Sequence, residues 1–123
     1  MKIGLALLLL SLSTHAFADG NALLGNCALF ERFETKVAPL THSDYLQLGQ
    51  CLGAVEGVRN TMLLYRPMLP PALRVCMPAG GIANGQAIRI ALKYLRDNPA
   101  ALHEDSSVLL MKAFHEAFPC PLG

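Results

Sequence analysis

The sequence predicts an all-α fold, a small domain of four to five helices with two disulfides. Apolar residues recur at spacings of three and four along several stretches, as on the buried face of a helix. No pair of alternating apolar and polar runs joined by an Asn-Gly or Asp-Gly turn predicts a β-hairpin. The chain also carries four cysteines, and an even number in a small exported domain is typical of disulfides.

The N-terminal residues predict export. Lys2 provides a short positive region, residues 3–12 are apolar, and Ala16-Phe17-Ala18 is a small-x-small cleavage signal. The apolar run is too short to span a membrane. We therefore expect residues 1–18 to be a signal peptide cleaved after Ala18, which leaves a soluble domain at 19–123. No cysteine precedes Cys27, so the lipid-attachment signal of a bacterial lipoprotein is missing.

The stretch from Cys76 to Cys120 is predicted to form two antiparallel helices. The first begins near Asn84, and the second begins at Pro99, because proline suits the first position of a helix. Asn98 is a good N-cap for that second helix. The expected apolar positions of the pair are Ile88, Ala91, Leu92, Leu95, Leu102, Leu109, Leu110, Ala113, Phe114, Ala117 and Phe118.

This hairpin also predicts the disulfide pairing. In an antiparallel pair the point before the first helix lies beside the point after the second, and Cys76 and Cys120 occupy those points. Their bridge leaves Cys27 to pair with Cys51. In the chain-entropy model each bridge stabilises the domain by about 3–4 kcal/mol. A zinc site is the alternative, but no Cys-x-x-Cys pair is present and no metal site is expected.

Two further helices precede the hairpin. Residues 21–33 carry an apolar face, residues 34–40 form a connection broken by Pro39, and residues 45–64 form the next helix. Three residues are candidate N-caps for that helix: Thr41, Ser43 and Asp44.

The helix at 45–64 carries a glycine stripe. Gly49, Gly53 and Gly57 are four residues apart and therefore share one face. Glycine costs about 1 kcal/mol against alanine inside a helix, so the stripe suggests that another backbone approaches closely. We expect internal packing against the first helix or the hairpin, and the alternative is a subunit interface.

Residues 65–81 form the longest irregular stretch, with four prolines followed by Gly80 and Gly81. Met68 and Leu69 lie between the prolines. One interpretation is a linker that folds these apolar side chains onto the core. The other is a stiff surface loop that carries a contact.

Composition and motifs exclude several classes of function. Without Lys2 the chain has nine basic and nine acidic side chains, which disfavours nucleic acid and gives no indication of an anionic membrane surface. No histidine lies in a His-Glu-x-x-His frame, and no serine lies between nucleophile-elbow glycines. We therefore expect neither an enzyme nor a cofactor.

An ordered set of short motifs spans residues 20–121. It comprises Gly-Gln-Cys-Leu-Gly at 49–53, Gly57-Val58, Cys76-Met77-Pro78, Gln86, Lys93-Tyr94-Leu95, Pro99, Leu102-His103 and Phe118-Pro119-Cys120-Pro121. The order and spacing resemble the Rap/Tai family of immunity proteins of bacterial type VI secretion.

The resemblance implies a helical, disulfide-bonded periplasmic protein, commonly a homodimer. Such proteins bind a secreted peptidoglycan amidase and block its active site. Two alternative functions remain: a periplasmic helical binding or chaperone-like protein with another client, and a structural component of the cell envelope.

Two surfaces are predicted to bind the partner. The first is the proline-bounded loop, because hot spots favour an aromatic residue, an arginine and apolar anchors. The second is the tip of the hairpin, where acidic groups can meet a basic rim. The loop residues are Tyr65, Arg66, Met68 and Leu69, and the tip residues are Asp97, Asn98, His103, Glu104 and Asp105.

Overall fold

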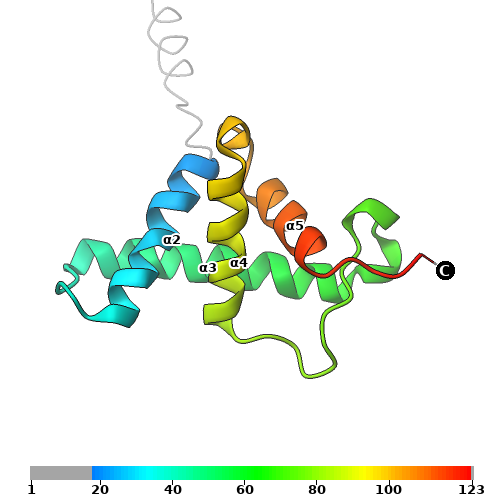
Figure 1. The fold of residues 1–123 in the computed structure, drawn as a ribbon, viewed down its shortest axis with the longest axis horizontal. Coiled ribbons are helices and arrows are strands. Elements are labelled where there is room, and N and C mark those ends of the chain that lie inside the picture. Colours follow the sequence, from blue (N-terminus) through cyan, green and yellow to red (C-terminus); the bar gives the residue numbers. More distant parts are fainter. Residues whose placement is uncertain (1–17, 123) are drawn as a thin grey trace, which may run out of the picture.

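The computed structural model describes residues 18–122. Three of its described α-helices lie side by side in one layer, across a longer fourth α-helix (Figure 1). Helices α2, α4 and α5 each contact α3, and α4 also contacts α2 and α5. Between residues 18 and 122 the structure contains no strand beyond two isolated β-bridges, and no helix long and apolar enough to cross a membrane. The α-helices are α2 (Gly20–Thr35), α3 (His42–Leu64), α4 (Asn84–Asp97) and α5 (Ser106–Ala117), and the 3-10 helices are η2 (Arg66–Met68), η3 (Pro71–Leu73) and η4 (Pro99–Ala101). The all-α prediction is confirmed, and the predicted signal peptide, except Ala18, lies outside the described residues.

Local capping fixes the ends of the first two helices. The carboxylate of Asp19 accepts a hydrogen bond from the Ala22 amide at the start of α2. Of the three candidate caps for α3, Thr41 is the one used. Its hydroxyl accepts from the Asp44 amide while the Asp44 carboxylate accepts from the Thr41 amide, which is a reciprocal capping box. Two otherwise unpaired amides are thereby satisfied where α3 begins.

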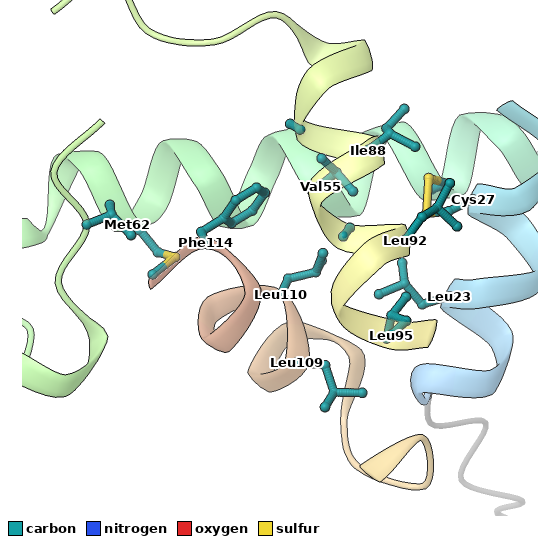
Figure 2. Close-up of a cluster of buried hydrophobic side chains, with 14 residues drawn as sticks. Leu23, Cys27, Val55, Met62, Ile88, Leu92, Leu95, Leu109, Leu110 and Phe114 are labelled. Atoms are coloured by element: carbon teal, nitrogen blue, oxygen red, sulfur yellow. A yellow bond between two sulfur atoms is a disulfide. The ribbon is translucent and has the colours of Figure 1, made fainter. Parts of the chain in front are cut away.

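Helix α4 lies at the centre of the packing. It buries five side chains, more than α2 or α3, and it packs between α2 and α5 while also contacting α3. Figure 2 shows side chains from α2, α3 and α5 converging on it. The core cluster consists of Leu23, Cys27, Cys51, Val55, Met62, Val75, Ala87, Ile88, Ala91, Leu92, Leu95, Leu109, Leu110 and Phe114.

Both predicted disulfides are confirmed. Cys27–Cys51 joins α2 to α3 inside the core, where both cysteines are buried. Cys76–Cys120 joins the segment before α4 to the segment after α5, and both cysteines are half-buried. The second bridge closes the open end of the hairpin, as the antiparallel arrangement requires.

The second helix of the hairpin does not begin where the sequence predicted. Pro99 starts only the short η4, and the chain then turns before Asp105 caps α5 through the amides of Ser107 and Val108. Asn98 precedes η4 and does not cap α5, and its side chain makes no capping bond because its amide donates to the Tyr94 carbonyl at the end of α4. The turn is stable because the carbonyls of Leu102 and Glu104 accept hydrogen bonds from the amides of Asn21 and Gly20 at the start of α2.

Among residues 18–122, no other element packs against the glycine stripe. A Cβ atom added at Gly49, Gly53 or Gly57 would meet nothing within 4 Å. Internal packing of the stripe was therefore the wrong prediction. Helices α2, α4 and α5 take up the other side of α3, which leaves a smooth and open stripe along the outer face of this helix.

Candidate functional site

The proline-bounded loop projects from the C-terminal end of α3. Tyr65 and Met68 are 49% and 80% exposed, and Arg66 is also exposed. Leu69 is half-buried and packs against the core. The structure therefore combines the two interpretations of this stretch, because Leu69 anchors the loop while the residues before it face solvent.

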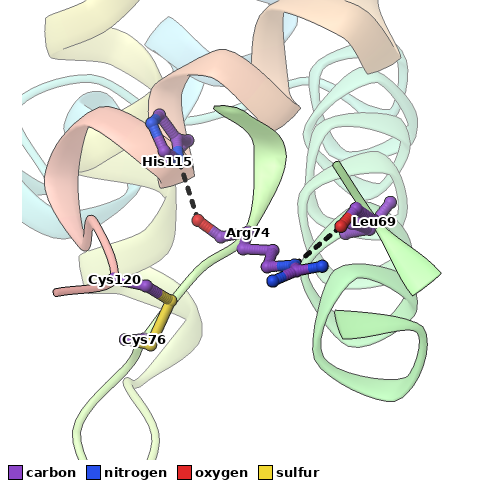
Figure 3. Close-up of a disulfide and its surroundings, with 5 residues drawn as sticks. All are labelled: Leu69, Arg74, Cys76, His115 and Cys120. Carbon is purple, nitrogen blue, oxygen red and sulfur yellow. Dashed lines mark hydrogen bonds between the residues drawn. A yellow bond between two sulfur atoms is a disulfide. The ribbon is translucent and has the colours of Figure 1, made fainter. Parts of the chain in front are cut away.

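Hydrogen bonds and a disulfide hold the loop in place (Figure 3). The Arg74 guanidinium donates to the Leu69 carbonyl at 2.7 Å, and the Arg74 carbonyl lies 2.7 Å from Nδ1 of His115 on α5. Two residues later, Cys76 is bridged to Cys120. The loop is thus tied at successive points to the C-terminal part of the hairpin, which limits the conformations open to it.

An apolar groove lies beside this loop. It has a volume of about 280 Å³ and runs between the C-terminal half of α3 and the start of α5. Leu69 forms one wall, so the residue that anchors the loop also shapes the groove. The lining residues are Gly57, Val58, Thr61, Met62, Leu69, Ser107 and Met111.

The carboxylates of the hairpin tip are already engaged within the chain. Asp97 pairs with Lys93, and Glu104 pairs with Lys112. Hydrogen bonds from these two lysines to their carboxylates are the main reason that the pKa of each lysine is raised. The carboxylate of Asp105 caps α5 instead. The tip consequently presents less free negative charge than its sequence suggests.

Other tip residues differ in their surroundings. His103 is exposed, whereas Asn98 is half-buried and bonded to the backbone of α4. The tip lies at the far end of α4 from the loop that follows α3, so the structure does not bring the two predicted surfaces together (Figure 1). They are separate candidates, not parts of one site.

A third surface, which the sequence did not indicate, lies where α2 is joined to α3. The predicted connection at 34–40 curves around a concave site of about 340 Å³, which we call the corner cup. Its lining residues are Arg32, Phe33, Lys36, Ala38, Pro39, Leu40 and Tyr45. The available sequence signal was Phe33, an aromatic residue in a polar run.

Two kinds of chemical group were sought among the described residues: metal ligands and free thiols. Within residues 18–122 no group of three or more histidine, cysteine or acidic side chains is placed to hold a metal ion. All four cysteines are in disulfides, so none is a free thiol. Of the two predicted surfaces, the loop that follows α3 is the one with exposed large apolar side chains, those of Tyr65 and Met68.

The comparison with protein families gives one match. The model described as Rap1a immunity proteins matches residues 19–120, which is almost the whole described chain. Neither the curated proteins nor the solved structures provide a match.

Proposed function

Because the chain belongs to the Rap1a immunity protein family, we propose that it neutralises a peptidoglycan amidase delivered by type VI secretion. In this proposal the protein binds the amidase and blocks its active site without any chemistry of its own. The observation that carries the proposal is the extent of the family match, which covers α2 to α5 of the described residues and both disulfides.

The periplasm is the proposed location. Disulfides form and persist in oxidising compartments, and this domain has two of them. The family match begins at residue 19, directly after the predicted cleavage site. An amidase that cuts peptidoglycan acts in the same compartment, so inhibitor and toxin would meet there.

The loop that follows α3 is the proposed inhibitory surface. Binding orders the groups at an interface, and a loop that is already ordered loses less entropy when it docks. The ties through Arg74 and the Cys76–Cys120 bridge supply that order. Tyr65 and Arg66 are of the residue types that dominate hot spots, and Met68 adds an adaptable apolar contact.

A homodimer is the proposed assembly. The open glycine stripe on α3 permits close approach of a second helix, and symmetric dimers pair the same patch on both subunits. The axis of such a dimer would lie beside the stripe, which leaves the loop at the end of α3 accessible. Light scattering at high micromolar concentration tests this assembly, and a monomer mass would contradict it.

Co-expression tests the function. A type VI secretion amidase from the same genome is exported to the periplasm of a host together with wild-type protein or a variant. We expect wild type to prevent lysis. Tyr65→Ala/Arg66→Ala should fail to protect, whereas the tip variant Asp97→Ala/His103→Ala should protect like wild type, because it leaves the loop intact.

The two variants serve as controls for each other. Both change exposed side chains, so circular dichroism and intact disulfides should show that both remain folded. Protection by the loop variant together with failure of the tip variant would move the inhibitory surface to the hairpin tip. If wild type neither protects nor binds, the immunity function is rejected for that pair.

A further inference from the structure

The corner cup is lined by two half-exposed aromatic residues. Phe33 is 49% exposed and Tyr45 is 53% exposed, and both line the cup. Phe33 is stacked on Phe30 with ring centroids 6.4 Å apart, and the Arg89 guanidinium lies 5.6 Å from the Phe30 centroid on α2. Phe33 therefore packs on a ring that Arg89 covers from α4.

Arg32 links the segments that surround the cup. Its guanidinium donates to the Pro39 carbonyl at 3.1 Å and lies 3.7 Å from the Asp44 carboxylate. That carboxylate also accepts from the Thr41 amide at 2.8 Å, which is the main cause of its lowered pKa. One arginine therefore ties α2, the connection and the start of α3 together.

Lys36 occupies a backbone conformation that lysine seldom adopts. With φ of 52° and ψ of 22°, it is the only non-glycine residue with positive φ among residues 18–122. This left-handed position ends α2 and is the one where glycine is usual. A lysine there forgoes the stability that glycine would give, and such outliers motivate a search for function.

The charge around the cup is positive. Each carboxylate at this end of α2 and α3 is paired with an arginine: Glu31 with Arg96, Glu34 with Arg89 and Asp44 with Arg32. In the described part of the chain, Lys36 forms no ion pair. The lysine ammonium is consequently the uncompensated charge beside the two rings.

We propose that the corner cup is a docking site for a protein segment that carries an aromatic side chain next to a carboxylate. The aromatic side chain enters the cup between Phe33 and Tyr45, and the carboxylate pairs with Lys36. The volume of about 340 Å³ is enough for one such side chain.

This site is separate from the loop proposed to inhibit the amidase. The two lie at opposite ends of α3, whose 23 residues span about 34 Å. The corner cup is tested with short peptides and without an amidase, so this inference does not depend on the amidase. Failure of one proposal therefore leaves the other standing.

The test is a titration of the 15N-labelled domain, followed by amide chemical shifts. The probes are acetyl-Glu-Phe-Glu-amide and the charge-reversed acetyl-Lys-Phe-Lys-amide, each added to about 10 mM because a peptide this small binds weakly. We expect saturable shifts centred on residues 32–45 with the acidic peptide, and at least ten-fold weaker binding of the basic peptide.

Three variants locate the binding. Tyr45→Ala should abolish saturation, and Lys36→Gly should weaken the acidic peptide about three-fold, the size of an exposed ion pair. Lys36→Gly keeps the fold, because glycine accepts positive φ without strain. Leu64→Ala is the control, since Leu64 is an exposed residue at the other end of α3 and does not line the cup, and this variant should leave peptide binding unchanged.

Three results would overturn the proposal. The first is an equal response to the two peptides, which would remove the role of charge. The second is unchanged binding in Tyr45→Ala, which would remove the role of the cup. The third is the absence of saturable shifts at residues 32–45 in wild type.

Discussion

Replacing the three glycines of the stripe by alanine is predicted to stabilise the isolated domain. Gly49, Gly53 and Gly57 lie inside α3, and an added Cβ would meet nothing within 4 Å at any of them. Alanine is favoured over glycine by about 1 kcal/mol in an exposed helix interior. The triple variant should therefore gain about 2–3 kcal/mol in the free energy of unfolding.

Urea denaturation measures this gain, and Gly20→Ala is the control. At Gly20 an added Cβ would lie 2.4 Å from Cδ1 of Leu109 and 2.9 Å from the backbone of Leu102. Overpacking of this kind costs about 1–3 kcal/mol. Glycine-to-alanine changes should consequently stabilise the domain at the stripe and destabilise it at Gly20.

Protein concentration separates the stability of the domain from its assembly. A dimer stabilises its subunits by mass action, so the gain should be clearest at submicromolar concentration, where dimers dissociate. At high concentration the triple variant should have a lower mass than wild type, because three methyl groups hold the helices apart. A triple variant less stable than wild type when monomeric would refute the open stripe, and an unchanged dimer would place the interface elsewhere.

Three further predictions concern the core, the ion pairs and the disulfides. Phe114→Ala should lose about 3–5 kcal/mol in urea denaturation, because the ring is fully buried; a loss below 1 kcal/mol would contradict this packing. The pKa of Glu31 is lowered from 4.5, chiefly by the hydrogen bond from Arg96, so its stabilisation is present above pH 4.5 and lost as the pH falls through the lowered value. The melting temperature of Arg96→Ala should therefore fall less on acidification than that of wild type. An equal fall would count against the ion pair of Glu31 and Arg96. Dithiothreitol should reduce Cys76–Cys120 before the buried bridge, and mass mapping of alkylated peptides would show the opposite order if burial does not control access.

The core and the disulfides were predictable because their signals are local and dense. On α4, the apolar spacing identified Ile88, Ala91, Leu92 and Leu95, and all four are buried. The cysteine pairing followed from the antiparallel geometry of the hairpin, which needs only the start of α4 and the end of α5 to lie side by side. Such patterns predict the core reliably, because a helical face that is buried must be apolar whatever it packs against.

The start of α5 was not predictable, because distant residues decide it. The Gly20 amide donates to the Glu104 carbonyl and the Asn21 amide donates to the Leu102 carbonyl. These bonds stabilise a turn where the sequence alone favours a continuing helix. The contacts join residues about eighty positions apart, and a local reading of Pro99 cannot include them.

The candidate site was predictable in part for a related reason. Proline spacing located the loop, yet it did not distinguish the half-buried Leu69 from the exposed Met68 next to it, because short 3-10 turns have no apolar period. The glycine spacing showed a shared face without showing what covers it. The corner cup is lined in part by the connection after α2, where Lys36 adopts a positive φ that no sequence pattern predicts.

Titration of purified amidase with this protein tests the central claim most directly. The readout is the release of new amino groups from isolated peptidoglycan at a fixed amidase concentration. Active-site occlusion predicts that activity falls linearly and reaches zero at one binding site per amidase, and that Tyr65→Ala/Arg66→Ala shifts the curve to higher protein concentration. Full amidase activity in the presence of excess protein, with binding demonstrated in the same mixture, would contradict the account.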